Sequence, residues 1–325
     1  MEQDKKNDIL FSKIPARVNG TAAVDLVTSP KFDTIRQGVA TNKLTKLSSS
    51  NIAGFNPITK VTSWDEENVK VFIAGYESKD RQLSPTTYRL LDVLTVYFTE
   101  CGSSDKTIEM PLQYFMDKCG LRDQKSARQQ VKSELDILSS IQIEWQEKDG
   151  KDVRDYEKTS IIQAHGIKNG KIIAVLSDNF FDYLSSAYIM PYPKQLYRIN
   201  AKKNPHSFYL LRKITEHKNM NNGKSNEDII AVKTLLDAMP DLPKYEDIKK
   251  RGKIRELIIE PFERDMDYLT DTLEWVYMHR SNQELTDKEL ATLDYNTFEN
   301  LMIKVYWKDY PDRTKKDRML AFKKK

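Results

Sequence analysis

The sequence predicts an α+β, mainly helical fold that consists of two tandem winged helix-turn-helix domains. Two observations support this prediction. The element order helix, strand, helix, turn, helix, hairpin occurs twice along the chain, and Asn169-Gly170 lies between two apolar runs in the first copy. Asn-Gly between such runs is among the strongest short-range signals of a β-hairpin.

The order of elements divides the chain into four segments. We expect a flexible arm at 1–65, a first winged-helix domain at 66–186, a second at 187–310 and a basic C-terminal tail at 311–325. Residues 1–65 show no sustained hydrophobic period, so we expect disorder or an extended arm there. Residues 69–74 form a short apolar run that fits either a strand or a helix.

The first copy begins at Ser84-Pro85, because a hydroxyl N-cap followed by proline is typical of a helix start. Gly120 is expected to end the second helix, and Asp123 to cap the long helix that follows it. The elements expected in this copy are helices from 85 to about 99, at 112–119 and from 124 to 137 or 138, and strands at 107–110, 141–145, 161–167 and 171–176.

The second copy follows a connector marked by Pro191 and Pro193. Asp178 is expected to cap a helix that reaches residue 184, just before that connector. Pro261 is expected to kink the longest helix of this copy, because proline removes a helical hydrogen bond. The elements expected here are helices at 205–218, 233–239 and 252–270, strands at 228–231, 275–278 and 303–307, and an inserted helix at 287–293.

Composition limits the class of protein more than it identifies a partner. The 325 residues carry a formal net charge of only +4, so the distribution of charge must indicate any nucleic-acid partner. No apolar run approaches the roughly 18 residues that span a bilayer, and the N-terminal residues lack the apolar core of a secretory signal. We therefore expect a cytoplasmic protein with no membrane partner.

Catalytic and metal-binding motifs are not found in the sequence. Cys101 and Cys119 have no partner at zinc-site spacing, and the four histidines never occur as His-x-His or His-Glu-x-x-His. No glycine-rich lysine loop of the kind that binds ATP phosphates is present. We therefore expect no enzyme, no metal and no cofactor, which also argues against a rolling-circle nicking protein.

The clearest candidate contacts to DNA lie on the long helix of the first copy. In a helix-turn-helix the second helix enters the major groove, and its early residues meet the base edges. Positions three or four apart share one helix face. Arg can pair with guanine, Gln with adenine, and Lys with phosphate. The candidates on this helix are Lys125, Ser126, Arg128, Gln129 and Lys132.

Basic residues also gather in the second copy. A basic group at a helix start opposes the helix dipole, so a nearby phosphate is a reason for it to be there. The candidates at the start of the long helix are Lys249, Lys250, Arg251, Lys253 and Arg255. The segment 194–218 is also rich in basic residues, among them Lys202 and Lys203, and with the tail it could track a phosphate backbone.

Five segments resemble the initiator replication proteins of iteron-bearing plasmids and related mobile elements. They are Leu83 to Leu91 (LSPTTYRLL), Lys125 to Val131 (KSARQQV), Asn204 to Leu211 (NPHSFYLL), Thr234 to Pro240 (TLLDAMP) and Ile258 to Leu269 (IIEPFERDMDYL). The resemblance implies a protein that binds repeated double-stranded DNA sites at an origin through two winged-helix domains. It also implies recruitment of the host helicase machinery and a possible homodimer.

Two other functions fit the residues without the resemblance. A winged-helix transcription regulator would read DNA with one domain and bind a protein with the other. An adaptor would use both winged helices for protein contacts only. Direct repeats beside the gene would favour initiation, whereas a single inverted repeat before a promoter would favour regulation.

Overall fold

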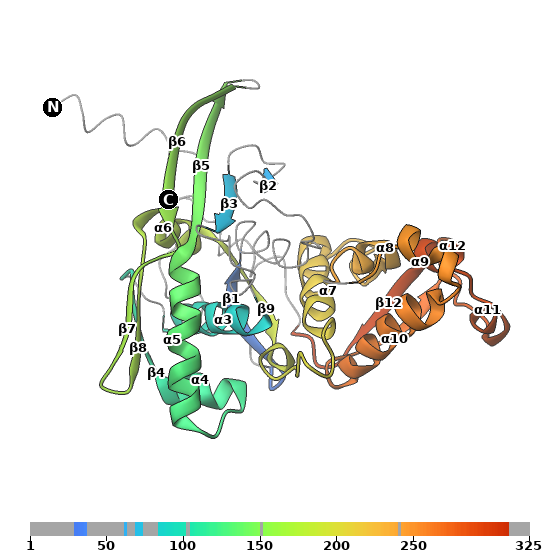
Figure 1. The fold of residues 1–325 in the computed structure, drawn as a ribbon, viewed down its shortest axis with the longest axis horizontal. Helices are drawn as coiled ribbons and strands as arrows, with labels where there is room; N and C mark the ends of the chain where they lie inside the picture. Colours follow the sequence, from blue (N-terminus) through green and yellow to red (C-terminus); the bar gives the residue numbers. More distant parts are fainter. Residues whose placement is uncertain are drawn as a thin grey trace.

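The computed structural model describes residues 29–37, 62–63, 69–73, 84–101, 105–149, 152–239 and 242–311. It is a mixed helix and sheet structure in which two groups of helices each pack on a three-stranded antiparallel sheet (Figure 1). We call residues 84–186 unit 1 and residues 207–307 unit 2. None of the helices in the described residues is long and apolar enough to cross a membrane.

Unit 1 follows the predicted order closely. Its elements are α3 (Pro85–Glu100), β4 (Thr107–Pro111), α4 (Leu112–Cys119), α5 (Gln124–Ser140), β7 (Ile162–Lys168), β8 (Lys171–Leu176) and α6 (Asp178–Ser186). The strand order in the sheet is β4-β8-β7. Asn169 and Gly170 have φ values of 51° and 72°, which a two-residue hairpin of type I′ requires. The predicted hairpin is confirmed.

The local signals at the helix ends of unit 1 are mostly confirmed. The Ser84 side chain accepts from the backbone N–H of Thr87, and Pro85 begins α3. Gly120 ends α4 with a φ of 67°, a left-handed conformation that glycine adopts without strain. Ser177, and not the expected Asp178, caps α6, because its hydroxyl accepts from Phe180 N–H.

Unit 2 repeats the topology of unit 1. Its elements are α7 (Ser207–Asn221), β10 (Ile229–Ala231), α8 (Val232–Leu236), α9 (Tyr245–Ile248), η4 (Lys249–Arg251), η5 (Arg255–Ile259), α10 (Glu260–Asp267), η6 (Tyr268–Asp271), β11 (Leu273–Met278), α11 (Asp287–Ala291), α12 (Tyr295–Asn300) and β12 (Met302–Trp307). The strand order is β10-β12-β11. In each three-stranded sheet, therefore, the strand that comes last in the sequence lies between the other two.

The long helix predicted in unit 2 is interrupted near Pro261. The segment η5 is a π-helix, in which the N–H of Glu260 donates to the carbonyl of Arg255. Pro261 has no N–H, so an α-helical hydrogen bond cannot form there, and a one-residue shift of the pattern is one way to accommodate it. The expected kink therefore takes the form of a π-helical turn that leads into α10.

Each unit carries an insertion beside its hairpin. In unit 1, β5 (Ile141–Asp149) and β6 (Asp152–Ser160) form a long hairpin between α5 and β7. Together with β2 (Thr62–Ser63) and β3 (Val69–Ile73) they form a four-stranded sheet in the order β2-β3-β5-β6, so residues 69–73 of the ambiguous run form a strand. In unit 2, α11 and α12 lie between β11 and β12. The sequence predicted only the first, and α12 is capped by the Asp294 side chain.

Residues 32–37 correct the expectation of a flexible arm at 1–65. They form β1 (Phe32–Gln37), which pairs antiparallel with β9 (Tyr188–Pro193), the segment expected to be a connector. Phe32 and Ile35 are each 1% exposed. No alternation of apolar and polar residues indicates this strand, because residues 32–36 are buried on both of its faces. Proline fits β9 because the described residues show no strand on its other edge.

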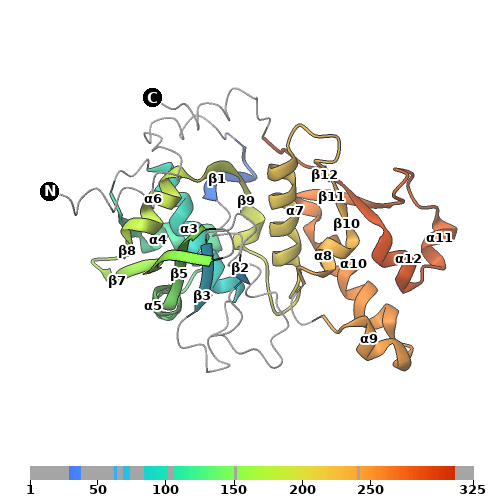
Figure 2. The same ribbon diagram turned by 90° about the horizontal axis from the view of Figure 1, so that it is seen from above.

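Buried polar contacts join the two units. Figure 2 shows α7 between unit 1 and the sheet of unit 2. Arg212 of α7 is ion-paired with Asp92 of α3 at 2.5 Å, and both side chains are almost fully buried. The hydroxyl of Tyr192, on β9, donates to the same Asp92 carboxylate. The buried apolar side chains form one continuous cluster across both units.

Candidate nucleic-acid interface

The helix α5 has an apolar face against unit 1 and a polar face toward solvent. Ala127, Val131, Leu135 and Leu138 are buried. The five candidates predicted on this helix are all exposed: Lys125, Ser126, Arg128, Gln129 and Lys132. The structure thus brings together the polar residues that the helical period placed on one face.

An N-terminal cap and a hydrogen bond to α3 fix the position of α5. The Asp123 carboxylate accepts from the backbone N–H groups of Lys125 at 3.3 Å and Ser126 at 2.9 Å, as predicted for its N-cap. The Ser126 hydroxyl also donates to Asp123, so this candidate takes part in the cap. Hydrogen bonds from Ser126 hold the pKa of Asp123 below its ordinary value. Glu134 accepts from the Thr87 hydroxyl of α3 at 2.5 Å.

The positive charges on α5 are not neutralised by the part of the protein that the structure describes. Lys125, Arg128 and Lys132 form no ion pair with any described residue. An exposed guanidinium and two exposed ammonium groups on one rigid helix are suited to bind phosphates and base edges.

The basic group of unit 2 has a different environment. Lys249 is ion-paired with Glu246, and Lys253 lies 3.5 Å from Glu256. Arg255 lies 3.6 Å from Glu260 and 3.9 Å from Glu263.

Lys250 and Arg251 are the other two members of that group. Lys250 is exposed and forms no ion pair with a described residue, whereas the Arg251 side chain lies outside the described residues. The five candidates surround η4 and η5, and the N-terminus of the helical segment has no side-chain cap. The backbone N–H groups expected to bind a phosphate are therefore not occupied by a capping side chain.

Lys202 and Lys203 lie in the turn between η3 (Lys194–Tyr197) and α7. Both side chains are exposed. Their backbone N–H groups donate to the Asn200 side chain at 3.0 and 3.3 Å, which holds the turn. These two lysines remain candidates for phosphate contacts between the units.

The basic residues of α7, which belong to the segment 194–218, do not form part of the expected phosphate-tracking surface. Arg212 is buried against Asp92. Lys213 pairs with Glu216 at 3.0 Å, and Lys218 is mostly buried between Glu227 and Asp228. Arg212 and Lys218 stabilise the fold because their acidic partners lie on other segments, whereas the partner of Lys213 lies on the same helix. The C-terminal tail beyond residue 311 lies outside the described residues.

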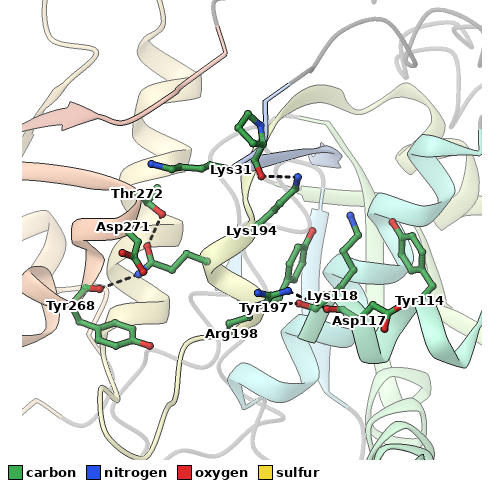
Figure 3. A pocket seen from close by; sticks show the side chains of 12 residues that line it. Lys31, Tyr114, Asp117, Lys118, Lys194, Tyr197, Arg198, Tyr268, Asp271 and Thr272 are labelled. Atoms are coloured by element: carbon green, nitrogen blue, oxygen red, sulfur yellow. Dashed lines mark hydrogen bonds between the residues drawn. The ribbon is translucent and has the colours of Figure 1, made fainter. Parts of the chain in front are cut away.

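The structure brings together a polar cluster at the junction of the units that no sequence pattern predicted (Figure 3). Lys118, at the end of α4, lies 2.6 Å from Asp33 of β1 and 3.5 Å from Glu100 of α3. Lys194 lies 3.6 Å from the same Asp33 and donates to the carbonyl of Pro30 at 2.9 Å. The partners are distant in sequence, so no local spacing could have indicated them.

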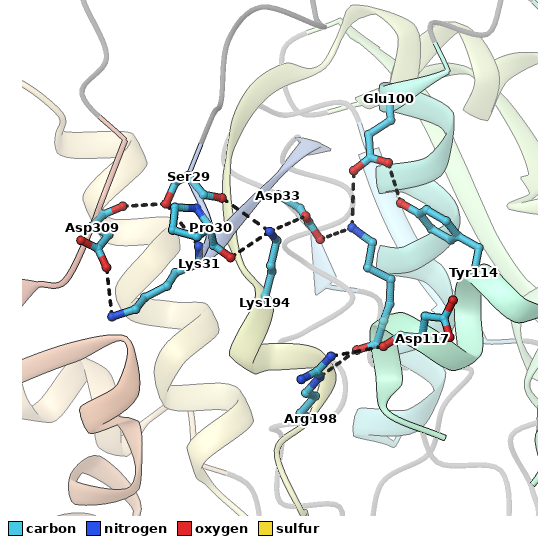
Figure 4. Close-up of polar contacts among 11 residues, drawn as sticks. Ser29, Pro30, Lys31, Asp33, Glu100, Tyr114, Asp117, Lys194, Arg198 and Asp309 are labelled. Carbon is cyan, nitrogen blue, oxygen red and sulfur yellow. Dashed lines mark hydrogen bonds and ion pairs between the residues drawn. The ribbon is translucent and has the colours of Figure 1, made fainter. Parts of the chain in front are cut away.

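The same cluster reaches unit 2 through the N-terminal side of β1 (Figure 4). The Ser29 hydroxyl donates to the carbonyl of Asp309 at 2.9 Å, and Lys31 pairs with the Asp309 carboxylate at 3.0 Å. Phe32 packs edge-on against Tyr310, with ring centroids 5.1 Å apart. Residues 29–33 thus contact α4 of unit 1 and the segment after β12 of unit 2.

Comparison with known proteins gives only distant structural likenesses. No protein-family model and no curated protein matches the chain. A crystal structure of domains 2 and 3 of RctB has 9% sequence identity and a TM-score of 0.41, covering 89% of this chain and 97% of that chain. A second crystal structure of RctB domains 2–3 has 10% identity and a TM-score of 0.39, covering 78% and 89%. Both TM-scores are low, so the function proposed below rests on this chain's own residues.

Proposed function

We propose that this chain is a sequence-specific double-stranded DNA-binding protein that initiates replication at a plasmid or mobile-element origin. The observation that carries the DNA-binding function is the exposed face of α5. It holds three basic side chains without described ion-pair partners, on the third helix of an element order that occurs twice. We propose a binding function, not a catalytic one.

Two tandem winged helices are the fold that we propose for the units. The support is the shared order of helix, strand, two helices and hairpin, together with the shared strand order in the sheets. In this interpretation α5 and the η5–α10 segment are the recognition helices, and β7–β8 and β11–β12 are the wings. The proposed domain boundaries remain 66–186 and 187–310.

The side chains of α5 suggest which residues read bases and which bind phosphates. Arg128 can donate two hydrogen bonds to guanine, and Gln129 can pair with adenine. Lys125 and Lys132 flank them on the same face and can bind phosphates, which supply affinity without sequence reading. In unit 2, Lys250 and the ion-paired Lys249, Lys253 and Arg255 would bind a second stretch of backbone.

The role in initiation is supported by the sequence resemblance to iteron-plasmid initiators. It would involve repeated origin sites, a host helicase as partner and a possible homodimer. Footprinting on the DNA around the gene can separate this role from regulation. Protection of several direct repeats favours initiation, whereas protection of one inverted repeat before a promoter favours a regulator.

Salt-dependent binding of the full chain to duplexes selected from a random library tests the DNA-binding function. The logarithm of affinity should fall with the logarithm of salt by about 0.9 per phosphate contacted. Replacing Lys125, Arg128 and Lys132 with alanine should weaken binding and make this dependence shallower. A control that removes three basic residues elsewhere, Lys106, Lys224 and Lys308, should bind nearly as the unchanged protein does. Equal affinities for all three proteins would contradict the proposal.

A further inference from the structure

A cavity of about 650 Å³ lies at the junction of the two units (Figure 3). Its lining comes from four segments: residues 30–31, α4, η3 with Arg198, and the stretch 268–272 that includes η6. This volume is within the range of small-molecule sites, about 300–1,000 Å³. The cavity is separate from the α5 face, and its basic residues include Lys194 and Arg198 of the basic segment 194–218.

The lining carries more positive than negative charge. Four basic residues, Lys31, Lys118, Lys194 and Arg198, line it against two acidic residues, Asp117 and Asp271. The Asp117 carboxylate accepts from the Gln113 side chain on its own helix at 2.8 Å.

Arg198 contributes a charge that no described carboxylate neutralises. Its guanidinium donates to two backbone carbonyls at the end of α4, those of Asp117 and Lys118, each at 3.3 Å. Lys118 and Lys194 share the single carboxylate of Asp33, and Glu100 is a further partner of Lys118 only. Lys118 and Lys194 therefore have a carboxylate partner, whereas Arg198 has none among the described residues.

The hydroxyl of Tyr197 indicates that the cavity lacks a hydrogen-bond acceptor. Tyr197 is 1% exposed, lines the cavity, and lies between the Lys194 and Lys118 side chains in Figure 3. Its hydroxyl has no hydrogen-bond partner among the described residues. Burial raises the pKa of Tyr197 well above its ordinary value, so the hydroxyl keeps its proton. A buried donor without an acceptor is costly, and an acceptor among cations is best supplied by an anion.

We propose that this cavity binds a phosphate group whose oxygens accept from Tyr197, Arg198 and the neighbouring lysines. The phosphate can belong to a free nucleotide or to the backbone of bound DNA, and the second source rests on the proposed function. Because the lining joins α4 of unit 1 to η6 of unit 2, an occupied cavity would connect the two units through the ligand.

The key variant is Tyr197→Phe, which removes the hydroxyl and nothing else. The hydroxyl has no partner in the described structure, so its loss should not weaken the fold. Tyr156→Phe is the matched control, because Tyr156 is exposed on β6, away from the cavity. Calorimetric titration of the full chain uses inorganic phosphate, then ADP, at matched ionic strength. Fluorescence anisotropy measures a selected duplex.

Loss of a hydrogen bond to a charged group should weaken phosphate binding by about tenfold or more in the Tyr197→Phe protein. Saturable binding of phosphate or ADP that Tyr197→Phe weakens and Tyr156→Phe does not supports the proposal with a free ligand. This result would stand even if DNA did not bind.

If neither small ligand binds but Tyr197→Phe weakens duplex binding, the ligand is a DNA phosphate. Arg198→Gln should then weaken duplex binding in the same way, since it removes the charge on the other side of the site. If Tyr197→Phe changes neither the small-ligand titrations nor duplex affinity, the proposal is overturned.

Discussion

The two units share one topology but present their basic residues differently. In unit 1, α5 is an uninterrupted helix of 17 residues with a side-chain cap, and its basic residues have no described ion-pair partners. In unit 2, the corresponding segment η5–α10 contains a π-helical turn and follows the short helices α9 and η4. Three basic side chains of this region are paired with glutamates one turn or so away.

The difference suggests that the two units bind a phosphate backbone in two different ways. The charges of α5 are available without any rearrangement. Those of unit 2 must exchange a carboxylate for a phosphate, which reduces the net gain of each contact. Exposed ion pairs contribute only about 0–1 kcal/mol, so the exchange remains feasible. We therefore expect unit 1 to respond to charge removal and unit 2 to respond to removal of its acids.

The largest effect is expected at the contact that holds the units together. Asp92→Ala would leave the Arg212 guanidinium buried without its carboxylate. Breaking one side of a buried ion pair costs about 3–5 kcal/mol. Urea unfolding should show this loss of free energy, whereas Glu109→Ala, in the exposed pair with Lys171, should cost less than about 1 kcal/mol. Similar losses in the two variants would mean that Asp92 does not couple the units.

The next effect distinguishes base reading by α5 of unit 1 from phosphate binding by Lys250 of unit 2. Arg128→Ala and Gln129→Ala should each cost about 1–3 kcal/mol on the preferred duplex and relax the preference at particular base pairs. Lys250→Ala in unit 2 should weaken all sequences about equally. Selection of binding sites with each variant measures this difference. Altered sequence preference in the Lys250→Ala protein, with none in the α5 variants, would reverse the assignment of roles.

A smaller effect is expected from freeing the charges of unit 2. The double variant Glu256→Gln and Glu260→Gln removes partners of Lys253 and Arg255 without changing side-chain size. Duplex affinity at low salt should rise by up to about 1 kcal/mol, a factor of roughly five. The same change at Glu109 and Glu274, two exposed acids outside this group, is the control. Unchanged or lower affinity in the double variant alone would show that these basic residues do not contact DNA.

The smallest effect concerns pH and the cap of α5. Because the pKa of Asp123 is lowered by its hydrogen bonds to Ser126, the folded state binds protons less readily than the unfolded chain. The stabilisation is therefore present above the unfolded pKa of about 3.9 and is lost as pH falls through the lower folded value. Asp123→Asn keeps a capping oxygen but does not titrate. Its unfolding free energy should fall less steeply with acidification, and parallel pH profiles would contradict this origin.

The sequence predicted unit 1 well because its signals are local. Ser84-Pro85, Gly120, Asp123 and Asn169-Gly170 each act within a few residues, and each predicted turn or helix end is present. The period of 3.6 residues per turn was also enough to identify the exposed face of α5.

What the sequence did not predict depends on contacts between distant residues. Arg212 lies in the basic segment 194–218 that was expected to track phosphates, but it is buried against Asp92, which lies 120 residues away. The strand β1 has no local period of its own, and it forms by pairing with β9, about 160 residues further along the chain. The cavity around Tyr197 is formed by four separate segments, so no motif could indicate it.

The pairing of β1 with β9 has a consequence for synthesis of the protein. Phe32 is made about 160 residues before its strand partner, so at about 5–20 residues per second it waits roughly 8–30 s for β9 to appear. Its aromatic neighbours Trp307 and Tyr310 emerge later still. During that interval Phe32 and Ile35 lack the strand that pairs with β1, while α3, against which β1 also packs, has already been made. The first described strand to leave the ribosome is thus completed only when nearly the whole chain has been made.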